Sequence, residues 1–334
     1  MPEMTRRLHQ TTPIALIGAN ILQITMALRR KRTIWILLAG IAAVVGLAAF
    51  LFFRFARPIG AGPAGPSVPR EIFSKTWTQR PVMLLGLGDS VTAGFGSRKG
   101  YSYFDRLIKN PADEFPDLSG LNLSAVFPNL VATNLSVSGS TSDEVAARQL
   151  AHVPAYGSNV LGIVVMTTGG NDLIHNYGHT PPREGAMYGA TWEQARPWVE
   201  NFKHRLNETL NLIKSRFPGG CEIFLANIFD PTDGIGDAEL AGLPAWKDST
   251  VILNAYNQVI QECAAENPEI HLVDMHTAFL GHGIHRTQFW RQHFDWKDPH
   301  YWFYTNLEDP NERGYDVIRR LFLNEIAQAR NRIN

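Results

Sequence analysis

The hydrophobic pattern after residue 80 alternates between two kinds of segment. Short apolar runs bounded by turn residues predict buried β-strands, and segments with apolar residues at helical spacing predict amphipathic helices between and after them. Because strands that alternate with helices form parallel sheets, the pattern predicts a three-layer α/β/α sandwich with a mostly parallel sheet. The predicted strands are residues 82–87, 130–135, 160–166, 222–226 and 270–273, and the predicted helices are residues 192–217, 251–265 and 313–330.

A longer apolar run, residues 33–53, contains 21 residues without a charge. A helix of that length crosses a hydrocarbon core of about 30 Å. The rival interpretation is a cleaved signal peptide, whose apolar region is usually about 7–15 residues long and ends at small residues, whereas this run ends in Phe52 and Phe53. The basic residues 29–32 precede the run. The positive-inside rule therefore predicts a single-pass anchor with a cytoplasmic N-terminus and an extracytoplasmic domain.

The chain is accordingly predicted to have four parts. They are a cytoplasmic segment (1–32), a transmembrane anchor (33–53), a linker rich in Pro, Gly and Ala (54–76) and a globular domain (77–334). Within the linker, the stretch 57–69 is typical of an extended spacer that lifts the domain off the membrane. A shorter apolar run at 13–28 indicates either a second span or an upstream extension before a start at Met26.

Charge and cysteine content narrow the function classes. The 31 basic and 31 acidic residues cancel, and the globular part contains no Lys/Arg run. The composition therefore gives no support for nucleic-acid binding. The two cysteines, Cys221 and Cys263, are either small buried hydrophobic residues or, outside the cytoplasm, a disulfide. The sequence leaves both interpretations open.

Three polar turns that contain glycine follow predicted strands, at the edge of a parallel sheet where ligands bind. Ser90 directly follows the first strand, where a nucleophile would be exposed, although a serine there is equally typical of a helix N-cap. Gly139 follows the second strand and offers a backbone N–H. Asn171 follows the third strand and offers a side-chain amide. Such donors stabilise an oxyanion.

The runs GDSVTAG (88–94) and GGND (169–172), with the Gly139 turn between them, resemble the first three blocks of the SGNH/GDSL hydrolase family. The resemblance begins near residue 82 and excludes the apolar N-terminal segment. It implies a flavodoxin-like sheet, Ser90 as nucleophile, and an oxyanion hole formed by the Ser90 N–H, the Gly139 N–H and the Asn171 side chain. It also implies cleavage of a small-molecule, glycan or lipid ester through an acyl-Ser90 intermediate, with no cofactor or metal.

The base is where the chain departs from that family, which usually carries Asp-x-x-His shortly before a Pro-Asn turn. Asp309 stands where the histidine is expected. A carboxylate with a pKa near 4 is a poor proton acceptor and would not reprotonate the leaving alkoxide efficiently. We therefore expect His300 as the base, with Asp298 or Asp295 as its orienter. The other candidates for base or orienter are His282, His285, His293 and Asp309.

The departure at position 309 leaves two alternatives open. One is an inactive binding domain that keeps the fold, and the other is an O-acyl transferase or deacetylase that acts on cell-envelope polysaccharide. Residues 230–237 superficially resemble a calcium loop but lack its alternating acidic pattern, so we expect them at the rim of the active site. The aromatic-rich segment 289–304 is typical either of an acyl or sugar pocket or of plain core.

Overall fold

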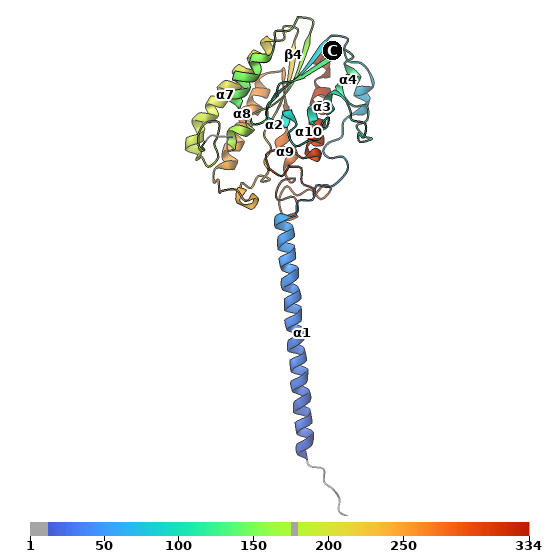
Figure 1. The fold of residues 1–334 in the computed structure, drawn as a ribbon, viewed down its shortest axis with the longest axis vertical. Coiled ribbons are helices and arrows are strands. Elements are labelled where there is room, and N and C mark those ends of the chain that lie inside the picture. The colour runs from blue at the N-terminus through green and yellow to red at the C-terminus, as the bar shows by residue number, and fades with distance from the viewer. Residues whose placement is uncertain (1–12, 175–179, 334) are drawn as a thin grey trace, which may run out of the picture. The chain divides into compact units, whose positions relative to one another are not determined.

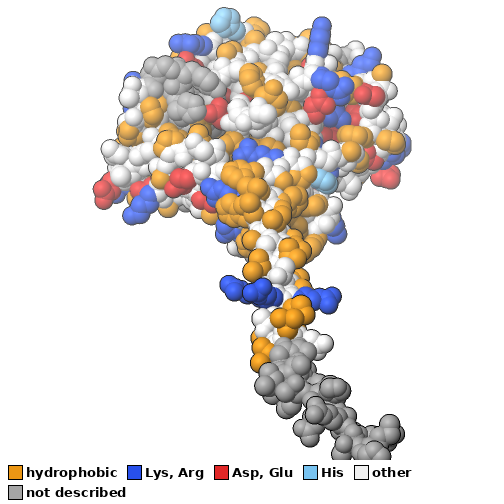
Figure 2. All heavy atoms as spheres, turned by 60° about the horizontal axis from the view of Figure 1, so that its bottom comes forward, with side chains coloured by type: hydrophobic (Ala, Val, Ile, Leu, Met, Phe, Trp, Pro, Cys, Tyr) orange, Lys and Arg blue, Asp and Glu red, His pale blue; other side chains and the backbone are white. Residues whose placement is uncertain are grey.

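The structure is a computed structural model that describes residues 13–174 and 180–333. It comprises two units, Met1–Ala56 and Arg57–Asn334, which are described separately. In the first unit, the predicted span and the shorter run before it form one continuous helix, α1 (Pro13–Phe55). The part Ile21–Phe55, with a mean hydropathy of 2.7, is long and apolar enough to serve as a membrane span or a signal anchor. Figure 2 shows the basic cluster as a blue band across this largely hydrophobic helix.

The second unit is built on a five-stranded sheet in which all neighbouring strands are parallel, in the order β2-β1-β3-β4-β5. This order, with a switch point between β1 and β3, is the flavodoxin-like arrangement that we expected. All five predicted strands are confirmed to within about a residue at each end. They are β1 (Val82–Gly88), β2 (Leu130–Asn134), β3 (Leu161–Thr167), β4 (Cys221–Ala226) and β5 (Ile270–Val273).

Helices cover both faces of the sheet (Figure 1). The helices α7 (Trp192–Ser215) and α8 (Ser249–Glu266) pack together on one face, and α3 (Tyr103–Ile108) and α10 (Glu312–Gln328) pack together on the other. Successive strand residues alternate between the two cores, as the period of a strand requires. Ile163 contributes to the α10 side and Val164 to the α7 side. The predicted three-layer sandwich is therefore confirmed.

Short helices lie mainly in the connections between these elements. The α-helices are α2 (Ser90–Ala93), α4 (Leu123–Val126), α5 (Ser142–Glu144), α6 (Gly170–Leu173), α9 (Met275–Phe279) and α11 (Arg330–Ile333). The 3₁₀-helices are η1 (Arg70–Ser74), η3 (Leu150–His152) and η4 (Ala238–Ala241), and η2 (Val145–Gln149) is a π-helix. Because α2 and α6 directly follow β1 and β3, both begin at the carboxyl edge of the sheet, where the site lies.

The carboxyl end of β1 lies unusually close to β3. Gly88 has a φ of +124°, and a Cβ there would lie 1.9 Å from Thr167 O. Only glycine accepts such a conformation together with such a contact. The Gln149 side chain holds the backbone of Gly88 in place. Gly88 N donates to Gln149 Oε1 at 2.8 Å, and Gln149 Nε2 donates to Gly88 O at 2.7 Å. The two turns that follow β1 and β3 are thereby held together.

Residues 57–69 are not the free spacer that we expected. They pack along α10, where Arg313 Nη1 donates to Ala61 O at 2.9 Å and Ala64 N donates to Asp316 Oδ2 at 3.2 Å. A segment of small residues brings its backbone close to a neighbouring helix, and side chains of that helix then satisfy the backbone polar groups. The prediction of a linker was therefore wrong for this stretch, which belongs to the compact domain.

The cysteines do not form a disulfide. Cys221 opens β4 and Cys263 lies near the end of α8; both are free and buried. Burial raises the pKa of both thiols, which disfavours the reactive thiolate. Of the two interpretations that the sequence left open, the small buried hydrophobic residue is the one observed.

We expect Gly88→Ala to lower the free energy of unfolding by about 3 kcal/mol or more, because the added methyl group meets a backbone carbonyl and the φ is unfavourable. Gly120→Ala is the matched control, since Gly120 has a φ of +82° and nothing lies within 4 Å of an added Cβ. We expect a cost of about 1 kcal/mol there. Urea unfolding of the two variants measures the difference. Equal costs would show that the close approach to β3 does not matter.

Candidate active site

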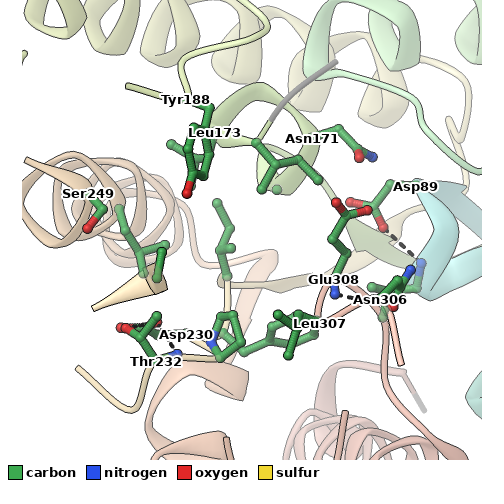
Figure 3. Close-up of a pocket in the computed structure, with 18 of the residues that line it drawn as sticks. Asp89, Asn171, Leu173, Tyr188, Asp230, Thr232, Ser249, Asn306, Leu307 and Glu308 are labelled. Atoms are coloured by element: carbon green, nitrogen blue, oxygen red, sulfur yellow. Dashed lines mark hydrogen bonds between the residues drawn. The ribbon is translucent and has the colours of Figure 1, made fainter. Parts of the chain in front are cut away.

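A pocket of about 220 Å³ opens at the carboxyl edge of the sheet. It is lined by the turns after β1, β3 and β4 and by residues 306–308, which precede α10. Figure 3 shows Asp89, Asn171 and Glu308 at one end of the pocket and Ser249 toward the other. Pockets at this edge are the usual ligand sites of open α/β sheets.

Ser90 is the first residue of α2 and lines the pocket. The preceding residue, Asp89, caps the helix by accepting a hydrogen bond from Val91 N at 3.1 Å. The same oxygen accepts a hydrogen bond from Thr167 Oγ1 at 2.7 Å, which connects the cap to the end of β3. The N-cap of α2 is therefore Asp89 and not Ser90, which was the alternative interpretation of the serine. The Ser90 side chain is left available for chemistry.

Burial raises the pKa of Asp89 to about 6, although the hydrogen bonds from Thr167 and Val91 oppose the shift. The carboxylates of Asp309 and Asp172 add smaller repulsive contributions. Asp172 is itself buried, and burial raises its pKa as well, against hydrogen bonds from Ser142 and the charge of Arg205. The polar end of the pocket is therefore rich in carboxyl groups and poor in solvent.

Two of the three expected oxyanion donors, Asn171 and Gly139, lie on turns that are joined by a hydrogen bond. Asn171 Nδ2 donates to Ser140 O at 3.0 Å, and Ser140 directly follows Gly139, whose φ of +84° permits the turn. Gln149 Nε2 reaches Ser140 Oγ at 3.2 Å and so supports the same turn. An amide nitrogen has two hydrogens. One of them fixes the turn, and the other remains for the pocket that Asn171 lines.

Asp309 does not itself line the pocket, but its carboxyl group lies beside the Ser90 hydroxyl. Its side chain is 2% exposed. Burial raises the pKa of this carboxyl above its ordinary value, while hydrogen bonding from the Ser90 hydroxyl and from Asn306 lowers it. Asn306 Nδ2 donates to Asp309 Oδ2 at 2.7 Å, and Oδ1 has no well-aligned hydrogen-bond partner among the described residues. Hydrogen bonds between catalytic groups are often long or poorly aligned in an unliganded site.

Asn311 holds the segment that carries Asp309. Its side-chain oxygen caps α10 by accepting hydrogen bonds from Arg313 N and Gly314 N, each at 3.0 Å. Its Nδ2 donates to Tyr301 O at 2.7 Å. The Pro-Asn turn thus sets the start of the helix and the position of the residue before the proline. This is the placement that the family motif implied for its histidine.

His300 and Asp298 do pair, but away from Ser90. His300 Nδ1 lies 2.5 Å from Asp298 Oδ1, and Asp298 Oδ2 accepts a hydrogen bond from Arg313 Nη2 at 2.6 Å. The His300 ring lies against Gly60, where a Cβ would be 2.6 Å away. Neither residue is among those that line the pocket, and no hydrogen bond joins either side chain to Ser90 in the described structure. His300, the base that we expected, therefore packs against the segment that precedes β1.

The other histidine candidates also lie outside the pocket. His282 stacks on Trp302, and burial lowers its pKa. His285 Nε2 lies 2.8 Å from Asp237 Oδ1. Among the described residues that line the pocket there is no histidine. The remaining two candidates, which lie in the same connection between β5 and α10 and do not line the pocket, are His293 and Asp295.

Residues 306–308 form a wall of the pocket that the sequence analysis did not predict. Leu307 and Glu308 line the pocket, and Leu307 has a φ of +68°, which is uncommon for a residue other than glycine. No sequence signal marks this conformation. The rim expected from residues 230–237 is found in part, since Asp230 and Thr232 line the pocket.

The family model described as the GDSL-like lipase/acylhydrolase family matches residues 87–317. The chain belongs to this family. The matched stretch runs from the end of β1 into α10 and therefore includes every turn that forms the pocket. Membership identifies the chain as a hydrolase of the ester-cleaving type. A comparison with curated proteins finds no match.

Several solved structures are similar to this chain. An acetylxylan esterase from Geobacillus stearothermophilus is 19% identical, with a TM-score of 0.45 and coverage of 74% of this chain and 95% of that one. An extracellular lipase from Streptomyces rimosus is 19% identical, with a TM-score of 0.44 and coverage of 70% and 94%. A phospholipase A1 from Streptomyces albidoflavus is 20% identical, with a TM-score of 0.41 and coverage of 70% and 94%.

The raised pKa of Asp89 predicts a pH-dependent cost to stability. The folded state binds this proton more tightly than the unfolded state, whose aspartate has a pKa near 3.9. Stability therefore falls as pH rises between about 4 and 6, by on the order of 2–3 kcal/mol. We expect Asp89→Asn to flatten the pH dependence of the unfolding free energy in this window. A parallel pair of curves for wild type and variant would contradict the assignment.

Proposed function

We propose that this hydrolase cleaves carboxylic esters through an acyl-Ser90 intermediate, with the Asp309 carboxylate as proton acceptor in place of a histidine. The observation that carries the proposal is the position of Asp309 beside the hydroxyl of Ser90, which lines a pocket whose described lining contains no histidine. A nucleophile, a base and a group that orients the base are the parts that such a site requires. Here Asn306 is the orienting group.

Burial answers the main objection to an aspartate base. A carboxylate with its ordinary pKa is too weak a base for the serine hydroxyl and too strong an acid to keep the proton. Burial raises the pKa of Asp309 above its ordinary value. The higher pKa makes the carboxylate a stronger base and keeps the proton available for the leaving alkoxide.

The reaction then proceeds in two steps. Asp309 accepts the Ser90 proton while the hydroxyl oxygen attacks the ester carbonyl, and the oxyanion is stabilised by the amide of Asn171, a type of contact worth about 3 kcal/mol of barrier. The carbon–oxygen bond to the alcohol breaks, and the protonated Asp309 returns the proton to the departing alkoxide. Asp309 next accepts a proton from a water molecule that attacks the acyl-serine; the bond between the acyl carbon and the Ser90 oxygen breaks, the acid leaves, and Asp309 returns the proton to the Ser90 oxygen.

The lining of the pocket indicates which part of the substrate lies there. Most of its residues away from Ser90 are apolar, from the turn after β4, from η4 and from the first turns of α8. Examples are Ile228, Phe229, Trp246 and Leu253. Apolar groups of a ligand gain from leaving water in such a place. We infer that the acyl group, or an equally apolar alcohol, occupies this side of the pocket.

We expect Asp309→Asn to lower kcat/KM for p-nitrophenyl butyrate by about 10²–10⁴-fold, the usual contribution of a general base. The amide keeps the shape of the carboxyl group but cannot accept the proton. His300→Ala is the matched comparison, because its ring lies on residues 57–69, and we expect it to leave turnover largely unchanged. Full loss in His300→Ala with activity retained in Asp309→Asn would overturn the proposal.

Fluorophosphonate labelling separates an active hydrolase from a binding domain that has kept only the fold. An activated serine attacks the probe and forms a covalent adduct, which mass spectrometry of the digested protein would place on Ser90. We expect the adduct in the wild type and its absence in Ser90→Ala, with the circular dichroism spectrum unchanged. A wild-type protein that neither labels nor turns over p-nitrophenyl esters would favour the binding domain.

A further inference from the structure

The residues that directly follow α1 are hydrogen-bonded to the rest of the hydrolase domain. This helix ends at Phe55, and Pro58 O already accepts a hydrogen bond from Tyr301 N at 2.7 Å. Only Ala56 and Arg57 lie between them, and three Cα–Cα steps of about 3.8 Å span at most about 11 Å. If α1 lies in a bilayer, so short a connection limits how far Pro58 can lie from the end of that helix.

A cluster of charged side chains secures this attachment. Asp298 binds both His300 and Arg313, and Arg313 in turn donates to the carbonyl oxygens of Ala61 and Gly62 at 2.9 and 2.8 Å. Lifting residues 58–62 off the domain would therefore break the two hydrogen bonds that Arg313 donates, and the Asp298 carboxylate that holds Arg313 in place is largely shielded from water. Hydrogen bonds to a charged group contribute more to stability than neutral ones. The segment is expected to stay in place.

The loop beside this attachment exposes large aromatic and basic side chains. We call residues 289–297 the aromatic loop. Within it Trp296 is 75% exposed and Trp290 is 54% exposed, and Arg291 and Lys297 are exposed as well. The combination of tryptophan with basic residues is typical of the membrane–water interface, where the ring meets the acyl boundary and the cation meets the headgroups. This segment does not line the pocket, contrary to one of our two expectations for residues 289–304.

We propose that the aromatic loop is a membrane-docking surface that enters the headgroup region of the bilayer crossed by α1. Trp296 lies only two residues before Asp298, which pairs with Arg313, and Arg313 in turn binds residues 61 and 62 shortly after the end of α1. The same connection continues to residues 306–308, which line the Ser90 pocket. Docking at the loop holds the pocket near the lipid surface. The proposal depends on the membrane anchor and not on the proposed chemistry.

The test uses the full chain reconstituted into vesicles of phosphatidylcholine and phosphatidylglycerol. An environment-sensitive fluorophore is attached to the thiol introduced by Trp296→Cys, and by Lys297→Cys as a second position. The two native cysteines are buried and react poorly. Ser158→Cys is the matched control, since Ser158 is exposed in the turn before β3, at the opposite edge of the sheet from the pocket.

We expect blue-shifted emission, and quenching by nitroxide-labelled lipids, at positions 296 and 297 but not at position 158. Equal emission and quenching at all three positions would overturn the proposal, as would a protein that does not float with the vesicles. Because the readout is spectroscopic, it holds for Ser90→Ala as well as for the wild type. Failure of the proposed hydrolysis would therefore leave this result unchanged, and the two failures can be told apart.

Discussion

The site depends on how closely β1 and β3 approach each other at their carboxyl ends. Gly88 lies against Thr167 O with no room for a side chain, and Gln149 closes the arrangement by binding both backbone groups of Gly88. Because of this approach, Thr167 can reach Asp89, and the turn of Ser90 lies beside the turn of Asn171. Ser90 and Asn171, the proposed nucleophile and oxyanion donor, therefore line the same pocket although they are far apart in the sequence. The geometry comes from the backbone rather than from flexible side chains.

Around this backbone the pocket concentrates buried carboxyl groups. Asp89 and Asp172 hold the turns after β1 and β3, and each is compensated by hydrogen bonds from neighbouring residues. Asp309 differs because its buried Oδ1 has no well-aligned hydrogen-bond partner among the described residues. A buried carboxylate with unused acceptor capacity and a raised pKa is an unfavourable structural element. Such a cost is typical of a functional group. A histidine is absent from the described lining, and Asp309 has the properties that a base in its place requires.

The sequence predicted most of the fold and part of the site, for identifiable reasons. Burial on both faces gives β1, β3 and β4 largely apolar sequences, and apolar residues at helical spacing predict the helices that the structure confirms as α7, α8 and α10. The packing of residues 57–69 was missed because small residues bind through backbone carbonyls, which leave no side-chain pattern. The base was assigned to His300 because an ordinary aspartate pKa was assumed. Burial, which changes that pKa, is a property of the folded chain and cannot be read from a local motif.

The central claim is that a carboxylate, and not an imidazole, accepts the proton of Ser90. The most direct test is the temperature dependence of the acid limb in the pH profile of kcat/KM for p-nitrophenyl butyrate. Ionisation of a carboxyl group releases almost no heat, whereas loss of a proton from imidazolium absorbs a large amount. We predict an acid limb above the ordinary pKa of aspartate whose midpoint does not move between 10 and 40 °C. A midpoint that falls steeply with temperature would contradict the account and return the role of base to a histidine.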